Sequence, residues 1–306
     1  MWNLNNAPPT VIDARVLASL PAALRRQVAS EWASANKPGH IVDSFLEGPA
    51  FDRGGNLYLT DIPHGRIFRL TTQLEWQVVA ETGGWPNGIA IDREGLLWVA
   101  DYRRGLLRVD PASGSTDVVL GHRNSEAFKG LNDLHFDAAG DLYFTDQGQT
   151  GLHDPSGRVY RLRTSGQLDL LIANGPSPNG VVLDTTGSVL FVAMTRANAV
   201  WRAPLLPDGS LSKVGAFRTF FGTSGPDGLA IDVDNRLVVA HASLGGAFVI
   251  NQRGEVTHFV RSPEGATVTN VAFRPGTSAL VMTESHSGAV LEATLTAPGA
   301  PLLSHC

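Results

Sequence analysis

The sequence is nearly devoid of cysteine and has no long hydrophobic run. Its one cysteine is Cys306, the last residue, which excludes an internal disulfide framework and a cysteine-ligated zinc site. No apolar stretch approaches the roughly 18 residues that a membrane-spanning helix needs. The first residues lack a basic segment followed by an apolar one, so we predict no secretory signal and a cytoplasmic protein.

Charge is also sparse. Only 17% of the 306 residues are charged, the net charge is −5, and no run of basic residues occurs. This excludes nucleic acid and anionic membranes as the main partner. Hydrophobic residues make up 43% of the chain, enough for a large core, and 33 glycines and 18 prolines favour a turn-rich, all-β protein.

One pattern recurs six times along the chain. Each copy has a polar residue, a short apolar stretch, in most copies an Asp and a Gly-containing turn, and then a second apolar strand. The copies begin at Glu47, Asn87, Asn132, Asn179, Asp227 and Asn270. These starts lie 40 to 48 residues apart, and periods in the forties with several strands per unit are typical of propeller blades. The pattern predicts an all-β, six-bladed β-propeller.

The repeat also divides the chain. Residues 41–296 are predicted to form the propeller, and residues 1–40 a short N-terminal extension. In that extension we expect a strand over 11–17 that completes the last blade and a helix over 22–36 that packs on one face of the ring. The Pro- and Gly-containing tail 297–306 is expected to be loose.

The first residue of each copy is the most informative. The innermost strands of a propeller line its central channel, so the six equivalent positions meet around one axis. All six carry oxygen-bearing side chains, two of them the carboxylates Glu47 and Asp227. Turn formation explains Asn-Gly pairs, but glutamate is a poor turn former. Because hard divalent cations prefer oxygen ligands, the ring predicts a metal site.

Four sequence blocks resemble the SMP-30/gluconolactonase family. They are LEGPAF at 46–51, LND at 131–133, PNG at 178–180 and GPDGL at 225–229. The resemblance covers about residues 40–295 and implies a six-bladed propeller that hydrolyses lactones with one divalent metal. It implies Glu47, Asn179 and Asp227 as metal ligands, with Asn132 as a further ligand or as a hydrogen-bonding partner of a metal-bound water or the substrate. Asp227 would be the catalytic acid/base.

The identity of the metal and of the substrate stays open. Calcium is the default for an all-oxygen site, and Zn²⁺, Mn²⁺ or Fe²⁺ are alternatives. Sugar-lactonase members usually place Arg where this chain has Gly130, and the stretch 132–150 looks more like the drug-responsive lactonase branch. We expect Asn132, Asn87, Lys129 and His286 to contact the substrate.

The resemblance implies a mechanism in which the cation polarises the lactone carbonyl and stabilises the oxyanion. Asp227 would take a proton from water, although a role as direct nucleophile is also open. Two alternative functions remain: a non-enzymatic binding propeller, because PNGIAID at 86–92 resembles an NHL-type repeat, and a phosphotriester hydrolase using the same metal. The mixed Glu/Asn/Asp ring and the acidic charge favour the enzyme. The oligomeric state stays open.

Overall fold

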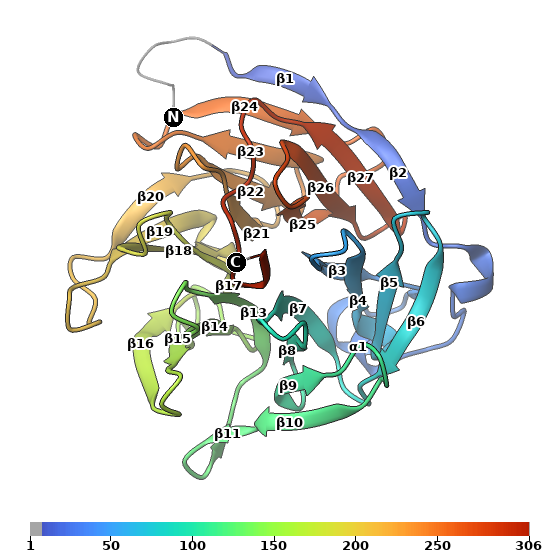
Figure 1. Cartoon of the computed structure of the whole chain (residues 1–306), viewed down its shortest axis with the longest axis horizontal. Coiled ribbons are helices and arrows are strands. Elements are labelled where there is room, and N and C mark those ends of the chain that lie inside the picture. The colour runs from blue at the N-terminus through green and yellow to red at the C-terminus, as the bar shows by residue number, and fades with distance from the viewer. Residues whose placement is uncertain (1–7, 306) are drawn as a thin grey trace.

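Six antiparallel sheets are arranged around a central channel, as Figure 1 shows. The computed structural model describes residues 8–305, and it confirms the all-β, six-bladed propeller. Within these residues no helix is long and apolar enough to cross a membrane.

Each blade begins with its innermost strand, and the strands follow one another outward. The first two blades contain β3 (Leu46–Phe51), β4 (Leu57–Asp61), β5 (Arg66–Leu70) and β6 (Trp76–Glu81), then β7 (Pro86–Ile91), β8 (Leu97–Asp101), β9 (Gly105–Val109) and β10 (Thr116–Leu120). The third and fourth contain β13 (Leu131–Phe136), β14 (Leu142–Asp146), β15 (Gly157–Leu162) and β16 (Leu168–Gly175), then β17 (Pro178–Leu183), β18 (Val189–Met194), β19 (Ala199–Pro204) and β20 (Gly215–Thr219). The last two contain β21 (Pro226–Ile231), β22 (Leu237–His241), β23 (Gly246–Ile250) and β24 (Val256–Arg261), then β25 (Val268–Phe273), β26 (Ala279–Glu284) and β27 (Ala289–Thr294).

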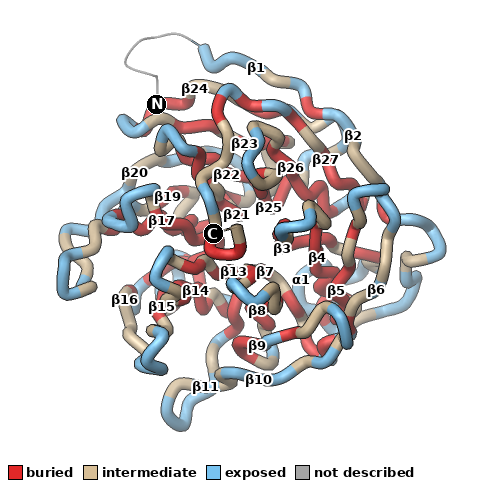
Figure 2. Tube along the Cα trace, in the orientation of Figure 1, coloured by how far each residue is buried: buried red, intermediate tan, exposed pale blue. Residues whose placement is uncertain are grey.

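Short elements decorate the ring. A hairpin of β11 (His122–Arg123) and β12 (Glu126–Ala127) joins the second and third blades, and single 3-10 turns are η2 (Ile62–His64) and η3 (Thr195–Ala197). The hydrophobic core lies between neighbouring blades. For example, Ala50 and Ile67 of the first blade pack in one cluster with Ile89, Val99 and Leu107 of the second. Figure 2 shows this buried interior, with exposed residues gathered on the outer strands and loops.

The N-terminal segment closes the ring. Strand β2 (Arg15–Ser19) pairs antiparallel with β27 and completes the last blade. The single strand expected over 11–17 is split in the structure, because its first residues belong to a separate strand, β1 (Thr10–Asp13). Strand β1 adds to the fifth blade by parallel pairing with β24. The exposed edges of two blades are thereby covered, which removes sites for unwanted strand pairing.

The predicted helix over 22–36 is much shorter in the structure. A 3-10 turn, η1 (Ala22–Leu24), is followed by extended chain and then by α1 (Glu31–Asn36). The helix begins where the Ser30 hydroxyl accepts a hydrogen bond from the backbone N–H of Ala33, at 3.1 Å. Its buried Trp32 packs against Ile62. The helix therefore borders the channel end at which the inner strands begin, here called the mouth.

The prediction of a loose C-terminal tail is wrong. The backbone N–H of Val233 donates to Pro298 O and that of Ala300 donates to Ile231 O, both at 3.0 Å. The tail ends in a 3-10 turn, η4 (Leu303–His305), in which Leu303 is 6% exposed. It crosses the channel opposite the mouth, and its dark-red end lies near the centre of the ring in Figure 1. The prolines and glycines suggested mobility, but Leu303 beside them is buried in an apolar cluster of the second and third blades.

Acidic residues recur at the ends of the second strands, and they are structural. A carboxylate oxygen of Asp61 accepts from Phe45 N, one of Asp101 from Trp85 N, and one of Asp146 from Gly130 N, at 2.8 to 3.0 Å. Each bond fixes the segment that leads into the blade's inner strand. These aspartates therefore hold the blade junctions.

Candidate metal and active site

A β-bulge marks the start of every inner strand. The pairing register shifts between Glu47 and Ala50 in the first blade and between Leu131 and Leu134 in the third, with equivalent shifts in the other four. A bulge inserts an extra residue and re-aims side chains, and bulges are common beside active sites. All six starting residues of the repeat lie in or directly beside these bulges.

Neighbouring inner strands approach one another closely at the bulges. A Cβ atom added to Gly48 would overlap the carbonyl oxygen of Asn87, and one added to Gly180 would overlap that of Asp227. Threonines of the second strands hold the next blade in place. The Thr145 hydroxyl donates to Asn179 O at 2.8 Å, and the Thr60 hydroxyl donates to Asn87 O at 2.7 Å. The glycines and hydroxyls together bring the repeat starts into one tight ring.

Three carboxylates at the start of the inner strands, Glu47, Asp133 and Asp227, are close enough for their charges to influence one another's pKa values. Burial raises the pKa of Glu47 above its usual value. Burial also raises the pKa of Asp227 well above its usual value, and the charges of Glu47 and Asp133 raise it further, while Asn179 and Arg196 oppose the rise. Burial, followed by the charge of Glu47, raises the pKa of Asp133 to about 8. Like charges are thus held together in a desolvated place.

This donor set suits a divalent cation. A bound cation would offset the mutual repulsion of the three carboxylates, and their oxygens are ligands that hard cations prefer. Within residues 8–305, no three acidic or histidine side chains lie close enough to hold a metal by themselves. A cation held here would need amide oxygens as well, and Asn179 is a hydrogen-bonding neighbour of Asp227.

Asn132 is fixed by a short polar chain. Its side-chain nitrogen donates to Gln147 Oε1 at 2.9 Å, and Gln147 Nε2 donates to Ser177 Oγ at 3.0 Å. The bond uses the amide nitrogen of Asn132, so its oxygen is the atom available to a cation or a water. Sequence reasoning missed Gln147, which no repeat pattern marks.

Asn270 differs from the other members of the ring. Its side-chain nitrogen donates to Glu47 Oε2 at 2.9 Å, and its oxygen accepts from Val271 N at 2.8 Å. Glu47 Oε2 also accepts from Gly48 N at 2.7 Å. Both polar atoms of Asn270 are engaged, so this residue orients Glu47 rather than offering a ligand.

Asp133 is the carboxylate that the sequence analysis missed. Its Oδ1 accepts from Leu134 N at 2.8 Å, and it is 8% exposed. The sequence did contain one signal that could have identified it, namely its position in the repeat. Four of the six copies have glycine after the polar start, whereas the third copy has Asp133.

The remaining predicted site residues lie at the mouth. Asn87 is half-buried and its carbonyl accepts from the Thr60 hydroxyl at 2.7 Å. Lys129 and His286 are exposed residues of loops that precede an inner strand or follow a second strand. Their contact with a substrate stays a prediction.

An aromatic wall also borders the mouth. The rings of Trp85 and Tyr102 lie 5.5 Å apart, and the Arg103 guanidinium stacks over Trp85 at 4.3 Å. A Cβ at Gly130 would overlap the Tyr102 ring. The glycine that replaces the expected arginine is therefore required by the aromatic side chain packed on it.

Comparisons with known proteins agree with the fold and the repeat. A family model described as "SMP-30/Gluconolactonase/LRE-like region" matches residues 45–286. The chain is 30% identical over 296 residues to lactonase drp35 of Staphylococcus aureus strain MRSA252, covering 91% of this chain and 86% of that protein. A second model, described as a ubiquitin binding region, matches residues 4–36. The described part of that stretch supplies β1 and β2 to the propeller, and Leu20 within it is buried.

Two solved structures share the architecture. One is XC5397, a gluconolactonase of Xanthomonas campestris, with a TM-score of 0.73 and 21% identity, covering 94% of this chain and 98% of that one. The other is the calcium-binding protein regucalcin of Agrobacterium tumefaciens strain C58, with a TM-score of 0.73 and 20% identity, covering 96% and 97%. At these identities the likeness establishes the fold alone.

Proposed function

The chain belongs to the SMP-30/gluconolactonase/LRE-like family, and from this premise we propose that it is a divalent-metal-dependent lactonase. The observation that carries the proposal is the convergence of Glu47, Asp133 and Asp227, whose pKa values are all raised in one ring of oxygen donors. Perturbed carboxylates gathered in a channel are typical of functional sites. The similarity to lactonase drp35 supports the reaction class.

Glu47, Asp227 and Asn179 would hold the cation, with Asn132 as a fourth ligand or a hydrogen-bonding partner of water. Calcium is the first candidate, because every donor is oxygen. When bound, the cation would supply Lewis-acid polarisation of the lactone carbonyl.

The protein's own residues would carry out the proton transfer and hold the other groups of the site in position. Asp227 would accept the proton of the attacking water and return it to the ring oxygen as the ester bond breaks, giving the hydroxy acid. The Gln147–Asn132 bond would hold the Asn132 amide oxygen toward that water. Asn270 would keep Glu47 oriented, so that the charge balance of the site does not depend on a mobile side chain.

The mouth favours a lactone with apolar or aromatic substituents over a sugar lactone. Trp85 and Tyr102 offer ring faces, and Gly130 stands where an arginine would otherwise meet sugar hydroxyls. Lys129, Asn87 and His286 would supply the polar contacts at this rim. A phosphotriester could use the same cation, so it belongs in the substrate panel.

The test measures lactone hydrolysis with a pH indicator, on chelated protein and after restoring one divalent ion. Sugar, aliphatic and aromatic lactones and one phosphotriester form the panel. Asp227→Asn and Glu47→Gln are the test variants, and Asp208→Asn, in an exposed turn, is the matched control. We expect turnover to require the ion, to fall at least 100-fold in Asp227→Asn and to be unchanged in the control. Metal-independent turnover, or full activity of Asp227→Asn, would overturn the proposal.

A further inference from the structure

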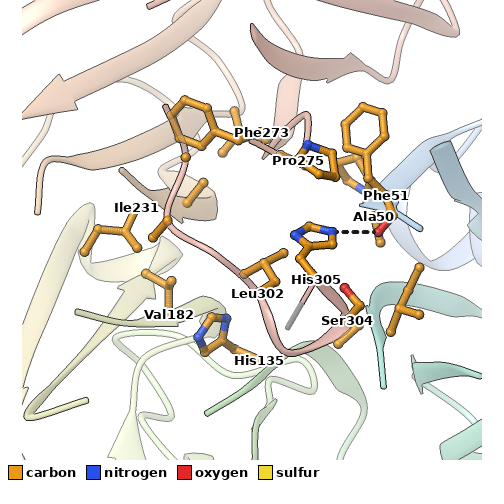
Figure 3. Close-up of a pocket in the computed structure, with 18 of the residues that line it drawn as sticks. Ala50, Phe51, His135, Val182, Ile231, Phe273, Pro275, Leu302, Ser304 and His305 are labelled. Atoms are coloured by element: carbon orange, nitrogen blue, oxygen red, sulfur yellow. Dashed lines mark hydrogen bonds between the residues drawn. The ribbon is translucent and has the colours of Figure 1, made fainter. Parts of the chain in front are cut away.

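A cavity lies in the channel between the ring of metal-site candidates and the C-terminal tail, and Figure 3 shows it. Its volume is about 390 Å³. Glu47, Asn132, Asn179 and Asp227 do not line it. It is therefore a separate space in the same channel.

Two polar side chains lie at the end of the cavity nearest the ring of metal-site candidates. They are Asp133 and Asn270, here called the roof. A Cβ at Gly88 would overlap Asp133 Oδ1, and one at Gly228 would overlap Asn270 Oδ1, so these side chains fill the gap to the neighbouring inner strands. Asn270 is in turn hydrogen-bonded to Glu47.

The cavity exists because of one repeated position. Three residues after the polar start of each of the first five copies, and two after it in the sixth, stand the residues Ala50, Ala90, His135, Val182, Ala230 and Ala272. All six line the cavity. Four alanines and a valine are too small to fill the axis of the ring.

His135 is the one polar residue among these six positions. Its side chain reaches into the cavity, and none of the residues in 8–305 hydrogen-bonds its imidazole. Burial lowers the pKa of His135 to about 4, so the ring is neutral at pH 7 and carries one donor and one acceptor nitrogen. The remaining wall is apolar and includes Leu134, Ile231 and Phe273.

Few charges face this space among the described residues. Asp133 lies in the roof, and Arg274, at the end of β25, is held by Glu292 at 3.5 Å. A cation or a free anion would therefore find no unpaired partner in the apolar wall. A neutral molecule is the occupant that the lining suits.

The C-terminal tail forms one wall of the cavity. Leu302 projects into the space that Val182 and Ile231 border, as Figure 3 shows. The last turn is tied by the Ser304 carbonyl, which accepts from Arg53 Nε at 2.6 Å, and by His305 Nε2, 3.2 Å from Phe51 O. These contacts, together with the backbone bonds of Val233 and Ala300, hold the tail across the channel.

We propose that this cavity is a second binding site, for a small neutral molecule with an apolar or aromatic body and one hydroxyl or carbonyl group that hydrogen-bonds His135. The volume lies within the range of small-molecule pockets. Apolar cavities stay dry and take up apolar ligands. The proposal does not depend on the lactonase activity, because Glu47, Asn132, Asn179 and Asp227, the predicted metal ligands and catalytic residue, do not line the cavity; Asp133 alone belongs to the carboxylate group and borders it.

The probes are 4-propylphenol and propylbenzene, which differ by one hydroxyl group, and binding to the full chain is measured by calorimetry. We expect one site per chain for 4-propylphenol and about fivefold weaker binding of propylbenzene, since one neutral hydrogen bond contributes about 1 kcal/mol. His135→Phe should remove that preference. Ala230→Phe should fill the space and weaken both probes at least tenfold, and Ala112→Phe, at an exposed turn, is the matched control.

Asp227→Asn separates the two sites. Unchanged binding in this variant supports the proposal, whatever happens to lactone turnover, whereas loss of binding would assign the probe to the metal site and overturn it. Absence of binding to the folded wild type would also overturn it, as would equal binding in Ala230→Phe. If Ala230→Phe does not fold, Ala90→Leu fills the same ring with a smaller side chain and makes the same prediction.

Discussion

In the metal-free protein, the free energy of unfolding should fall as the pH rises from 5 to 8. The pKa of Asp133 is about 8 in the folded chain, against an ordinary value of 3.8. Between these values the folded state holds a proton that the unfolded state has released. Raising the pH therefore favours unfolding. The stability that the protonated carboxyl contributes is lost as the pH rises toward and past its folded-state pKa of about 8.

The size of the effect follows from the proton count. One proton held only by the folded state changes the unfolding free energy by about 1.4 kcal/mol per pH unit, or roughly 4 kcal/mol between pH 5 and 8. Glu47 and Asp227 also have raised pKa values, so the observed titration belongs to the group of three. Domains are commonly stable by only about 5–15 kcal/mol, so this loss is large.

The assay is urea unfolding in the presence of a chelator at pH 5, 6, 7 and 8. Asp133→Asn keeps a side-chain oxygen for Leu134 N but removes the charge, so its stability should depend much less on pH. Calcium should stabilise the wild type more at pH 8 than at pH 5. Asp110→Asn, in an exposed turn, is the control and should follow the wild type. Equal stability at pH 5 and 8, or an unaltered slope in Asp133→Asn, would refute the reasoning.

Three further outcomes follow from the packing. Gly228→Ala should lower both calcium affinity and the melting temperature, because its Cβ would overlap an amide oxygen of the next blade, whereas Gly215→Ala meets open space; equal effects would contradict this. Leu303→Ala should destabilise the protein by about 2–4 kcal/mol in urea unfolding, and a change below 1 kcal/mol would mean that the tail is not packed. Gln147→Leu should lower lactone kcat/KM roughly tenfold with an unchanged circular dichroism spectrum, because Asn132 loses its partner; unchanged kinetics would exclude this positioning role.

The number of blades could be predicted because the same local turn residues recur in most copies of the repeat. An Asp whose side chain accepts turn N–H groups, as Asp137 does, and a glycine such as Gly140 at positive φ recur in most copies. The polar starts then follow from symmetry, because equivalent positions of a ring meet at its axis. Asp133 escaped this reasoning because it occupies a position that the repeat gives to glycine.

Non-local contacts explain the other differences. The stretch 25–29 has helix-forming residues, yet Arg25 pairs with Asp43 and the N–H of Arg26 donates to Asp43 O, so tertiary contacts hold it extended. The tail is rich in proline and glycine, yet Leu303 finds an apolar cluster around Tyr160. No local sequence pattern predicts the contact with Asp43 or the packing of Leu303.

The pairing of β1 and β2 also sets the order in which the molecule can be assembled. The ion pair of Asp13 with Arg261 joins residues 248 positions apart, and that of Arg15 with Glu292 joins residues 277 positions apart. Strands β1 and β2 are therefore synthesised long before their partners, and they pair with them only after most of the propeller has been made. Long loops of this kind make closure slow and late. Until then the fifth and sixth blades present open edges, so the nascent protein depends on protection from aggregation more than the finished ring does.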